Sequence, residues 1–189
     1  MPLFRRRKVV IGDDVPPPTT KPDAVPREAM VPLERGESLL ASAQEDADGH
    51  WLLLTTWRLL ERSEQGETVV ERAWHEIDTG AWNPDSWTLA VSFVGGGGRQ
   101  WGLRRRTGPG SVPQVFRERT SASVVLTRSI DLGPRRSARV SIRTVLRTRE
   151  LVEQVLLGKE TDPEDAELSA EVLQARQDLR TQVGLDPVR

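Results

Sequence analysis

The stretch HWLLLTTWRLLERS, residues 50–63, decides the fold. Two short runs rich in leucine and tryptophan follow one another in it, at 50–56 and 57–63. Polar turn sequences stand on either side, EDADG before the stretch and EQGE after it. Short apolar runs bounded by turn residues are typical of neighbouring strands in an antiparallel sheet. The stretch therefore predicts a pair of adjacent strands.

The same rhythm continues on both sides of this pair. Further strands are predicted at ESLLASA (37–43), TVVERAWHEI (68–77), WTLAVSFV (87–94) and RQWGLRR (99–105). The glycine run at 95–98 is predicted as a hairpin tip, because a phosphate-binding loop needs a helix after it and here a strand follows. Strands spaced about 8–12 residues apart and separated by turn residues predict an antiparallel all-β unit.

The succession of short strands and turns ends at residues 111–123, SVPQVFRERTSAS, where a short helix is predicted. Ser111 can act as its cap, Pro113 lies in its first turn, and Val112, Val115 and Phe116 share one face. Strand character returns at 124–132 and 137–146. The segment 151–158 is ambiguous between strand and helix, and its leucine and valine content slightly favours a hairpin partner for the preceding strand.

A long amphipathic helix is predicted near the C-terminus. Asp162 is expected as the N-cap, Pro163 at the first helical position, and Gly184 at the end. The apolar residues recur at spacings of three and four, which places them on one helical face. They are Leu168, Val172, Ala175, Leu179 and Val183.

Together these segments predict an α+β fold. It consists of a curled antiparallel sheet, or partly open β-roll, with a capping helix, an additional strand hairpin and the long C-terminal helix. Three parts are expected: a flexible proline-rich leader at 1–32, a β-rich domain at 33–131, and the hairpin with the C-terminal helix at 132–189.

The composition excludes several kinds of site. The chain has 189 residues and no cysteine, which rules out disulfides, thiolate metal sites and a cysteine nucleophile. Its two histidines, His50 and His75, are not at metal-ligand spacing, and no serine lies in a nucleophile-elbow motif. The expectation is therefore no catalytic residue, no metal and no cofactor. No apolar run is long enough for a signal peptide or a membrane span, so a cytoplasmic protein is expected.

The net charge of −1 hides a strong asymmetry along the chain. Residues 34–98 contain 12 acidic and 4 basic residues, whereas residues 99–149 contain 2 acidic and 13 basic residues. In the strand near 137–146, alternation predicts a row of arginines on one face: Arg135, Arg139, Arg143 and Arg147. Two interpretations stay open. The row is either an exposed anion-binding face, or it is neutralised internally by the acidic C-terminal helix or the acidic N-terminal sheet.

The segment LLLTTWRLLE (52–61) resembles the strand–turn–strand signature of bacterial pleckstrin-homology-like (PH-like) and GRAM-like domains. Leu54, Thr55, Arg58 and Leu59 carry the resemblance, and AWHEI (73–77) resembles a following step of that pattern. More closely, the chain resembles a set of uncharacterised actinobacterial proteins that have this domain followed by a hairpin and an acidic terminal helix. The resemblance implies a fold whose members bind anionic lipids, peptides or partner domains.

The sequence thus predicts a non-catalytic binding module that acts mainly in protein–protein interaction. The partner is unknown, a homo-oligomer is conceivable, and the amphipathic helix offers Leu168, Val172 and Leu179 for a partner. The alternative is peripheral binding to an anionic membrane, through the basic 99–149 segment or through Arg5, Arg6, Arg7 and Lys8. Nucleic acid is not expected, because aromatic residues are not interleaved with the arginines.

Overall fold

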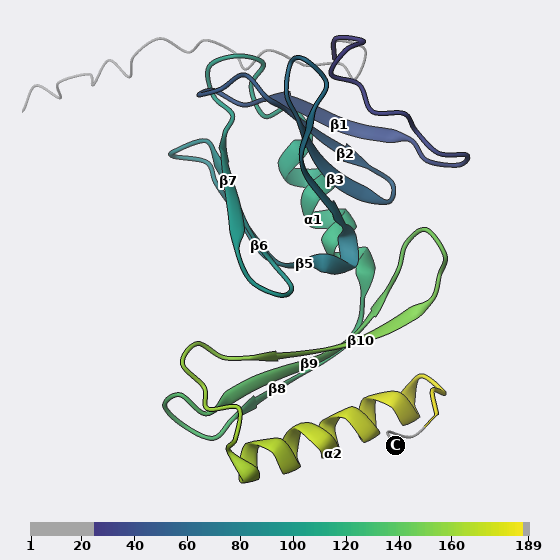
Figure 1. Ribbon diagram of the computed structural model, residues 1–189, viewed down its shortest axis with the longest axis vertical. Coiled ribbons are helices and arrows are strands. Elements are labelled where there is room, and N and C mark those ends of the chain that lie inside the picture. The colour runs from purple at the N-terminus through teal and green to yellow at the C-terminus, as the bar shows by residue number, and fades with distance from the viewer. Residues whose placement is uncertain (1–24, 187–189) are drawn as a thin grey trace, which may run out of the picture.

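The computed structural model describes residues 25–186 and shows an α+β fold with three antiparallel sheets and two helices (Figure 1). The first sheet is a four-stranded meander in the order β1-β2-β3-β4. Its strands are β1 (Leu39–Gln44), β2 (Trp51–Thr55), β3 (Arg58–Arg62) and β4 (Thr68–Ala73). The predicted strand pair at 50–63 is confirmed as β2 and β3.

A single 3-10 turn, η2 (Trp74–Glu76), carries the chain into the second sheet. That sheet has the order β5-β6-β7, with β5 (Ile77–Asn83), β6 (Thr88–Phe93) and β7 (Gly98–Gly102). The glycine run at 95–98 forms the turn between β6 and β7 and the start of β7. The described strands form no closed barrel, because each sheet ends in edge strands that pair on one side only.

Helix α1 (Val112–Ser123) follows these seven strands at the position that the sequence predicts. Pro113 lies in its first turn as expected, but the side chain of the N-cap residue Ser111 makes no capping hydrogen bond. Val112 and Phe116 are buried in the main hydrophobic core, the cluster that also contains Leu52, Trp74 and Trp101. The ring of Phe116 meets that of Trp74 edge-to-face at 6.1 Å, so α1 closes over the junction between the two sheets.

Both faces of β2 and β3 are buried, which explains their unbroken apolar runs. Leu52, Leu54 and Leu59 face the main core together with Trp74 and Trp101. The neighbouring residues Trp51, Leu53 and Leu60 face the opposite way and pack against Val25, Ala29 and Val31. Residues 25–32, which the sequence assigns to a flexible leader, are therefore an ordered cover of the first sheet. The rest of the predicted leader lies outside the described residues.

The third sheet has the order β10-β9-β8 and forms a separate layer with helix α2 (Figure 1). Its strands are β8 (Val124–Asp131), β9 (Ser137–Thr144) and β10 (Leu151–Leu157). The ambiguous segment at 151–158 is thus a strand. The sequence predicts a domain boundary at residue 131, but the strand pairing lies across it. Strand β8 pairs with β9 from Val124↔Arg143 to Asp131↔Ser137, so β8 belongs with the C-terminal part.

Helix α2 (Ala166–Gln182) begins later than the sequence predicts. Its N-cap is Asp165, whose carboxylate accepts the main-chain N–H of Leu168, and not Asp162. Thr161 bonds the carbonyl of Ser137, which holds residues 158–162 against the start of β9 and delays the helix. Gly184 follows the helix with a positive φ, as expected for a C-terminal stop.

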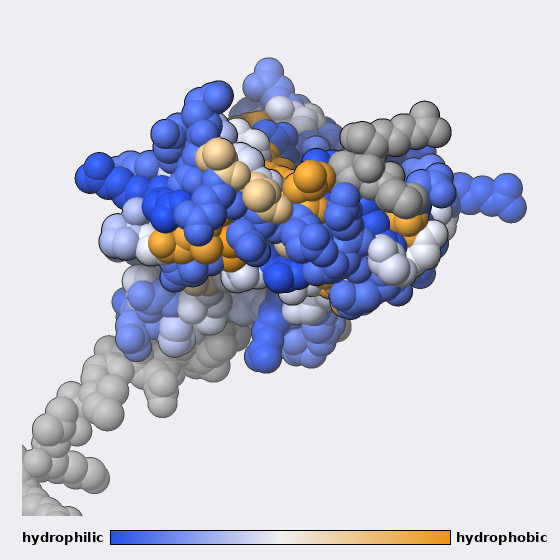
Figure 2. Space-filling model, turned by 90° about the horizontal axis from the view of Figure 1, so that it is seen from below, coloured by the Kyte–Doolittle hydropathy of each residue, from blue (hydrophilic) through white to orange (hydrophobic). Residues whose placement is uncertain are grey.

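The apolar face of α2 packs on its own sheet. Leu168, Ala175 and Leu179 are buried against Ala138, Val140 and Ile142 of β9, and Val172 is packed at the margin of this second core. The helical spacing is confirmed, but Leu168 and Leu179 are not exposed for a partner. The outer side of this layer is mainly hydrophilic, with small separate apolar areas (Figure 2). Among residues 25–186, no helix is both long enough and apolar enough to cross a membrane.

Candidate functional site

A groove runs between the edge strand β5 and helix α1. Its volume is about 510 Å³. Strand β5 supplies Gly80 and Trp82, and one side of α1 supplies the remaining lining residues: Pro113, Gln114, Phe116, Arg117, Thr120 and Ser121. Two elements that are about 30 residues apart in sequence thus form the two walls.

Gly80 sets the distance between these walls. A Cβ atom at this position would lie 2.3 Å from the Phe116 ring, well inside van der Waals contact. The absence of a side chain therefore lets the helix approach the strand and lets Phe116 form an apolar floor. Trp82 extends this floor along β5, and its ring meets that of Trp87 edge-to-face at 6.5 Å.

Strand β5 has one free edge in the part of the chain that the structure describes. It pairs with β6 from Ile77↔Phe93 to Asn83↔Thr88, and no other strand adjoins it. The main-chain groups on the outer side of an edge strand can pair with an additional strand. The groove therefore combines a row of backbone hydrogen-bonding groups with an apolar floor, which are the two features that an extended peptide requires.

The groove also has an electrostatic preference. Arg117 is its only charged lining residue, and it is exposed. Glu118, the nearest acidic residue on α1, lies outside the lining and bonds with Gln114. An acidic group on a bound segment could thus pair with Arg117, the one charged side chain among the lining residues.

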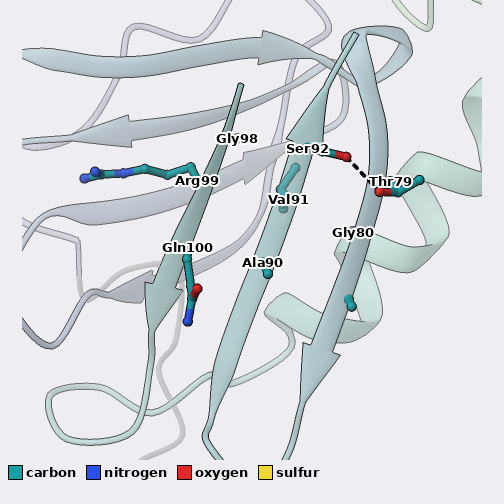
Figure 3. A pocket seen from close by; sticks show the side chains of 9 residues that line it. Thr79, Gly80, Ala90, Val91, Ser92, Gly98, Arg99 and Gln100 are labelled. Atoms are coloured by element: carbon teal, nitrogen blue, oxygen red, sulfur yellow. Dashed lines mark hydrogen bonds between the residues drawn. The ribbon is translucent and has the colours of Figure 1, made fainter. Parts of the chain in front are cut away.

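A shallow hollow of about 550 Å³ adjoins the groove on the outer face of the β5-β6-β7 sheet. Figure 3 shows its small side chains, with Thr79 bonded to Ser92 at 2.7 Å and Arg99 pointing away. Gly80 belongs to both cavities.

A buried ion network joins the first two sheets. The carboxylate of Glu61 on β3 is fully buried and bonds both nitrogens offered by Arg99 of β7. It also accepts the indole N–H of Trp101 at 2.9 Å and lies 2.8 Å from Nδ1 of His50. Burial acts to raise the pKa of Glu61, but the bonds from Arg99, His50 and Trp101 outweigh it and hold the pKa below its ordinary value.

This network also brings Asp48, His50 and Glu61 together at distances that could suit a metal ion. Both oxygens of Glu61 already accept hydrogen bonds, and the guanidinium of Arg99 supplies the positive charge. The group fits a structural role better than a metal site, because a cation would have to displace Arg99 from Glu61. The sequence gives no sign of this network, since its members lie on three separate strands or turns.

A second carboxylate, Glu37, is buried near the start of β1 and bonds Arg58 and Thr55. Burial acts to raise its pKa, but the hydrogen bonds from Arg58, Thr55 and the main chain of Glu34 hold the pKa below its ordinary value. Thr55 and Arg58 are two of the four residues that carry the family resemblance. Here they fix the chain before β1 to the β2–β3 turn.

The predicted arginine row does not form one exposed face. Arg139 pairs with Asp78 at the start of β5, and Arg147 pairs with Glu34 at 2.5 Å. Arg135 lies in a turn before β9 and pairs with Glu160. The N-terminal part supplies two of the three carboxylates. The side chains of Arg135 and Arg147 are still 73% and 57% exposed in these pairs, so an anion-binding role of these two residues stays a prediction.

Arg143, the fourth member of the row, is 5% exposed. It donates to the carbonyls of Trp74 and Ile77 and to the hydroxyl of Ser123, while its Nε has no hydrogen-bond partner. Burial lowers its pKa, and the nearby charge of Arg139 adds to this effect. Arg143 therefore fastens β9 to the junction of the first two sheets and is inaccessible to an anionic surface.

The other predicted site lies at Arg5, Arg6, Arg7 and Lys8, outside the described residues. Sequence reasoning missed the β5–α1 groove. The one available signal was the glycine at position 80 within a strand, which often marks a close approach of another part of the chain. Nothing in the sequence links Gly80 with Phe116.

Comparison of the chain with protein-family models, with curated proteins and with solved structures finds no match. The resemblance to PH-like domains and to actinobacterial proteins therefore stays a prediction.

Proposed function

We propose that the chain is a non-catalytic, PH-like binding module that holds an extended segment of another protein in the β5–α1 groove. The proposal is supported by the chain order of the N-terminal part. A four-stranded meander and a three-stranded meander are followed by the short helix that the sequence predicts as a capping helix. Function depends on the site, so the groove carries the argument.

The single observation that carries the proposal is the free edge of β5 beside an apolar floor. A segment that pairs with β5 gains main-chain hydrogen bonds, and its alternate side chains point towards the floor. Phe116 and Trp82 favour a bulky apolar side chain there. Arg117 favours an acidic residue near it. The partner is therefore an extended protein segment with both features.

A phage-displayed library of random peptides, selected on the purified chain, tests this proposal. We expect enrichment of peptides that combine a bulky apolar residue with an acidic residue. Binding of a selected peptide is then measured with Ser121→Trp, which fills the groove, and with Ala122→Trp. Ala122 is also exposed on α1 but does not line the groove, so it is the matched control.

The expected result is a loss of affinity of about tenfold or more for Ser121→Trp and little change for Ala122→Trp, since a hot-spot contact contributes ~2 kcal/mol or more. Failure to enrich any peptide family contradicts the proposal. So does an equal affinity of both variants for the selected peptide.

A further inference from the structure

The chain itself contains a segment with both features that the β5–α1 groove favours. Residues 1–24, which lie outside the described residues, precede the ordered cover of the first sheet that begins at Val25. Within them the sequence KVVIGDD, residues 8–14, joins three β-branched apolar residues to two aspartates. β-Branched residues fit an extended strand well. The composition of this segment thus matches the peptide that the groove is proposed to hold.

The spacing of residues within the segment also matches the groove. Side chains of an extended strand alternate between its two faces, so Val9, Ile11 and Asp13 share one face. When that face is turned to the groove, Ile11 can lie on the apolar floor at Phe116 while Asp13 lies near Arg117. Arg117 is the only charged lining residue, and it forms no ion pair with another described residue.

The remainder of residues 1–24 fits the groove less well. Proline has no main-chain N–H to donate to a neighbouring strand, and residues 16–18 and 22 are prolines. Residues 3–7, LFRRR, contain no acidic side chain, and their three arginines carry the same charge as Arg117. Residues 8–14 are therefore the part of this stretch that combines main-chain donors, apolar side chains and acidic side chains.

The connection between this segment and the fold is long enough to reach the groove. Val25 packs on the first sheet, and the described chain begins in the N-terminal part of the molecule, which also contains β5 and α1 (Figure 1). The ten residues between Asp14 and Val25 span about 35 Å when extended. This exceeds twice the radius of gyration of a 100-residue domain, which is about 13 Å.

We propose that residues 8–14 occupy the β5–α1 groove as an added strand and compete there with an external protein segment. This proposal rests on the proposed function of the groove. A short tether gives an effective concentration on the order of 1 mM. A dissociation constant of about 0.1 mM for the chain's own segment then lowers the apparent affinity for an external segment about tenfold. The groove is thereby reserved for partners that bind more tightly than this segment.

The affinity of the full chain for a peptide selected on it tests this competition. Ile11→Ser combined with Asp13→Asn removes both expected contacts of the chain's own segment. We expect this double variant to bind the selected peptide about tenfold more tightly than the wild type. The matched control is Val15→Ser combined with Asp23→Asn, which removes one apolar and one acidic side chain from the same stretch but outside residues 8–14. Its affinity should equal that of the wild type.

A synthetic peptide with the sequence KVVIGDD, residues 8–14, gives a second and direct test. We expect it to bind the chain that carries Ile11→Ser and Asp13→Asn, because the groove of that variant is free. Addition of Ser121→Trp, which fills the groove, should weaken this binding about tenfold or more, whereas addition of Ala122→Trp should leave it unchanged.

The outcomes separate this inference from the proposed function. Equal affinity of the wild type and the Ile11→Ser, Asp13→Asn variant for the selected peptide overturns the inference and leaves the proposed function standing. No binding of the KVVIGDD peptide, or binding that Ser121→Trp does not weaken, also overturns the inference alone. Failure of every selected peptide to depend on the groove overturns both.

Discussion

Glu61 is a buried carboxylate that links the first two sheets by polar contacts. Its carboxylate accepts hydrogen bonds from Arg99 and Trp101 of β7. Glutamine at this position would remove the counter-charge of Arg99 and replace one acceptor oxygen by an NH2 group that faces a donor. We expect Glu61→Gln to lower the free energy of unfolding by about 2 kcal/mol. Urea unfolding followed by tryptophan fluorescence measures this loss.

The control for this substitution is Glu67→Gln, because Glu67 is exposed and the structure gives its side chain no hydrogen bond. Its free energy of unfolding should stay within about 0.5 kcal/mol of the wild type. If both variants unfold at the same urea concentration as the wild type, Glu61 does not hold the sheets together.

The same carboxylates predict how stability depends on pH. The pKa values of Glu61 and Glu37 lie below the ordinary value of 4.5 in the folded chain. Their stabilising contribution is therefore fully present above about pH 4.5 and is lost as the pH falls through the folded-state pKa values. The urea concentration at the unfolding midpoint should therefore decrease as the pH is lowered below about 4.5.

Glu61→Gln provides the comparison for the pH dependence. Glu61→Gln cannot be protonated at this position, so the difference in stability between wild type and variant should shrink as the pH falls. A difference that stays constant down to pH values below the folded-state pKa would contradict the assigned role of the Glu61 charge.

At the scale of single elements, helix α2 shows how a local signal can mislead. The sequence Asp162–Pro163 has the form of a helix start, but the chain bonds back to Ser137 there, and the helix begins after Asp165. The Arg136 side chain, followed by the main-chain N–H of Leu168, lowers the pKa of Asp165 to about 2. Contacts with the third sheet therefore determine which of the two aspartates is the N-cap of α2.

We predict that Asp165→Ala lowers the free energy of unfolding measurably, because the helix loses its N-cap acceptor. Asp162→Ala should change it by less than about 0.5 kcal/mol. Urea unfolding of the two variants, followed by circular dichroism, distinguishes the two caps. A larger loss from Asp162→Ala would support the start that the sequence suggests.

Most strands and both helices could be predicted from the sequence, because alternation and helical spacing are local properties. The assignment of strands to sheets could not. Residues 124–131 have strand character whichever sheet they join, and only pairing with Ser137–Thr144 decides it. The groove is even harder to predict, since it depends on the missing side chain of Gly80 and on the ring of Phe116, which are far apart in sequence. No periodicity connects such positions.

At the scale of the whole molecule, some residues of the separated acidic and basic segments pair with each other within the fold. Arg139 and Arg147 of the basic segment meet carboxylates of the acidic N-terminal segment. Alternation correctly sets Arg139 and Arg143 on one face of β9, but only the packing shows that this face is turned inwards. Exposed arginines such as Arg104, Arg105 and Arg117 belong to the same basic 99–149 segment, so its contact with a membrane stays a prediction.

This charge distribution gives a prediction for lipid binding. A full-length variant with Arg5, Arg6, Arg7 and Lys8 replaced by glutamine should stay in the supernatant with phosphatidylserine vesicles at low salt. Each removed charge would have contributed about 1 kcal/mol near an anionic surface. Co-sedimentation of this variant, with neutral vesicles as the control, would instead reveal an anion-binding face on the rest of the chain.

The most direct test of the proposed binding mode is amide hydrogen exchange of the chain with and without a peptide selected on it. Strand addition predicts slower exchange at the outward-facing amides of β5, within Ile77–Asn83, together with slower exchange along α1. Unchanged exchange in β5, with protection at another sheet edge or at none, would contradict the account.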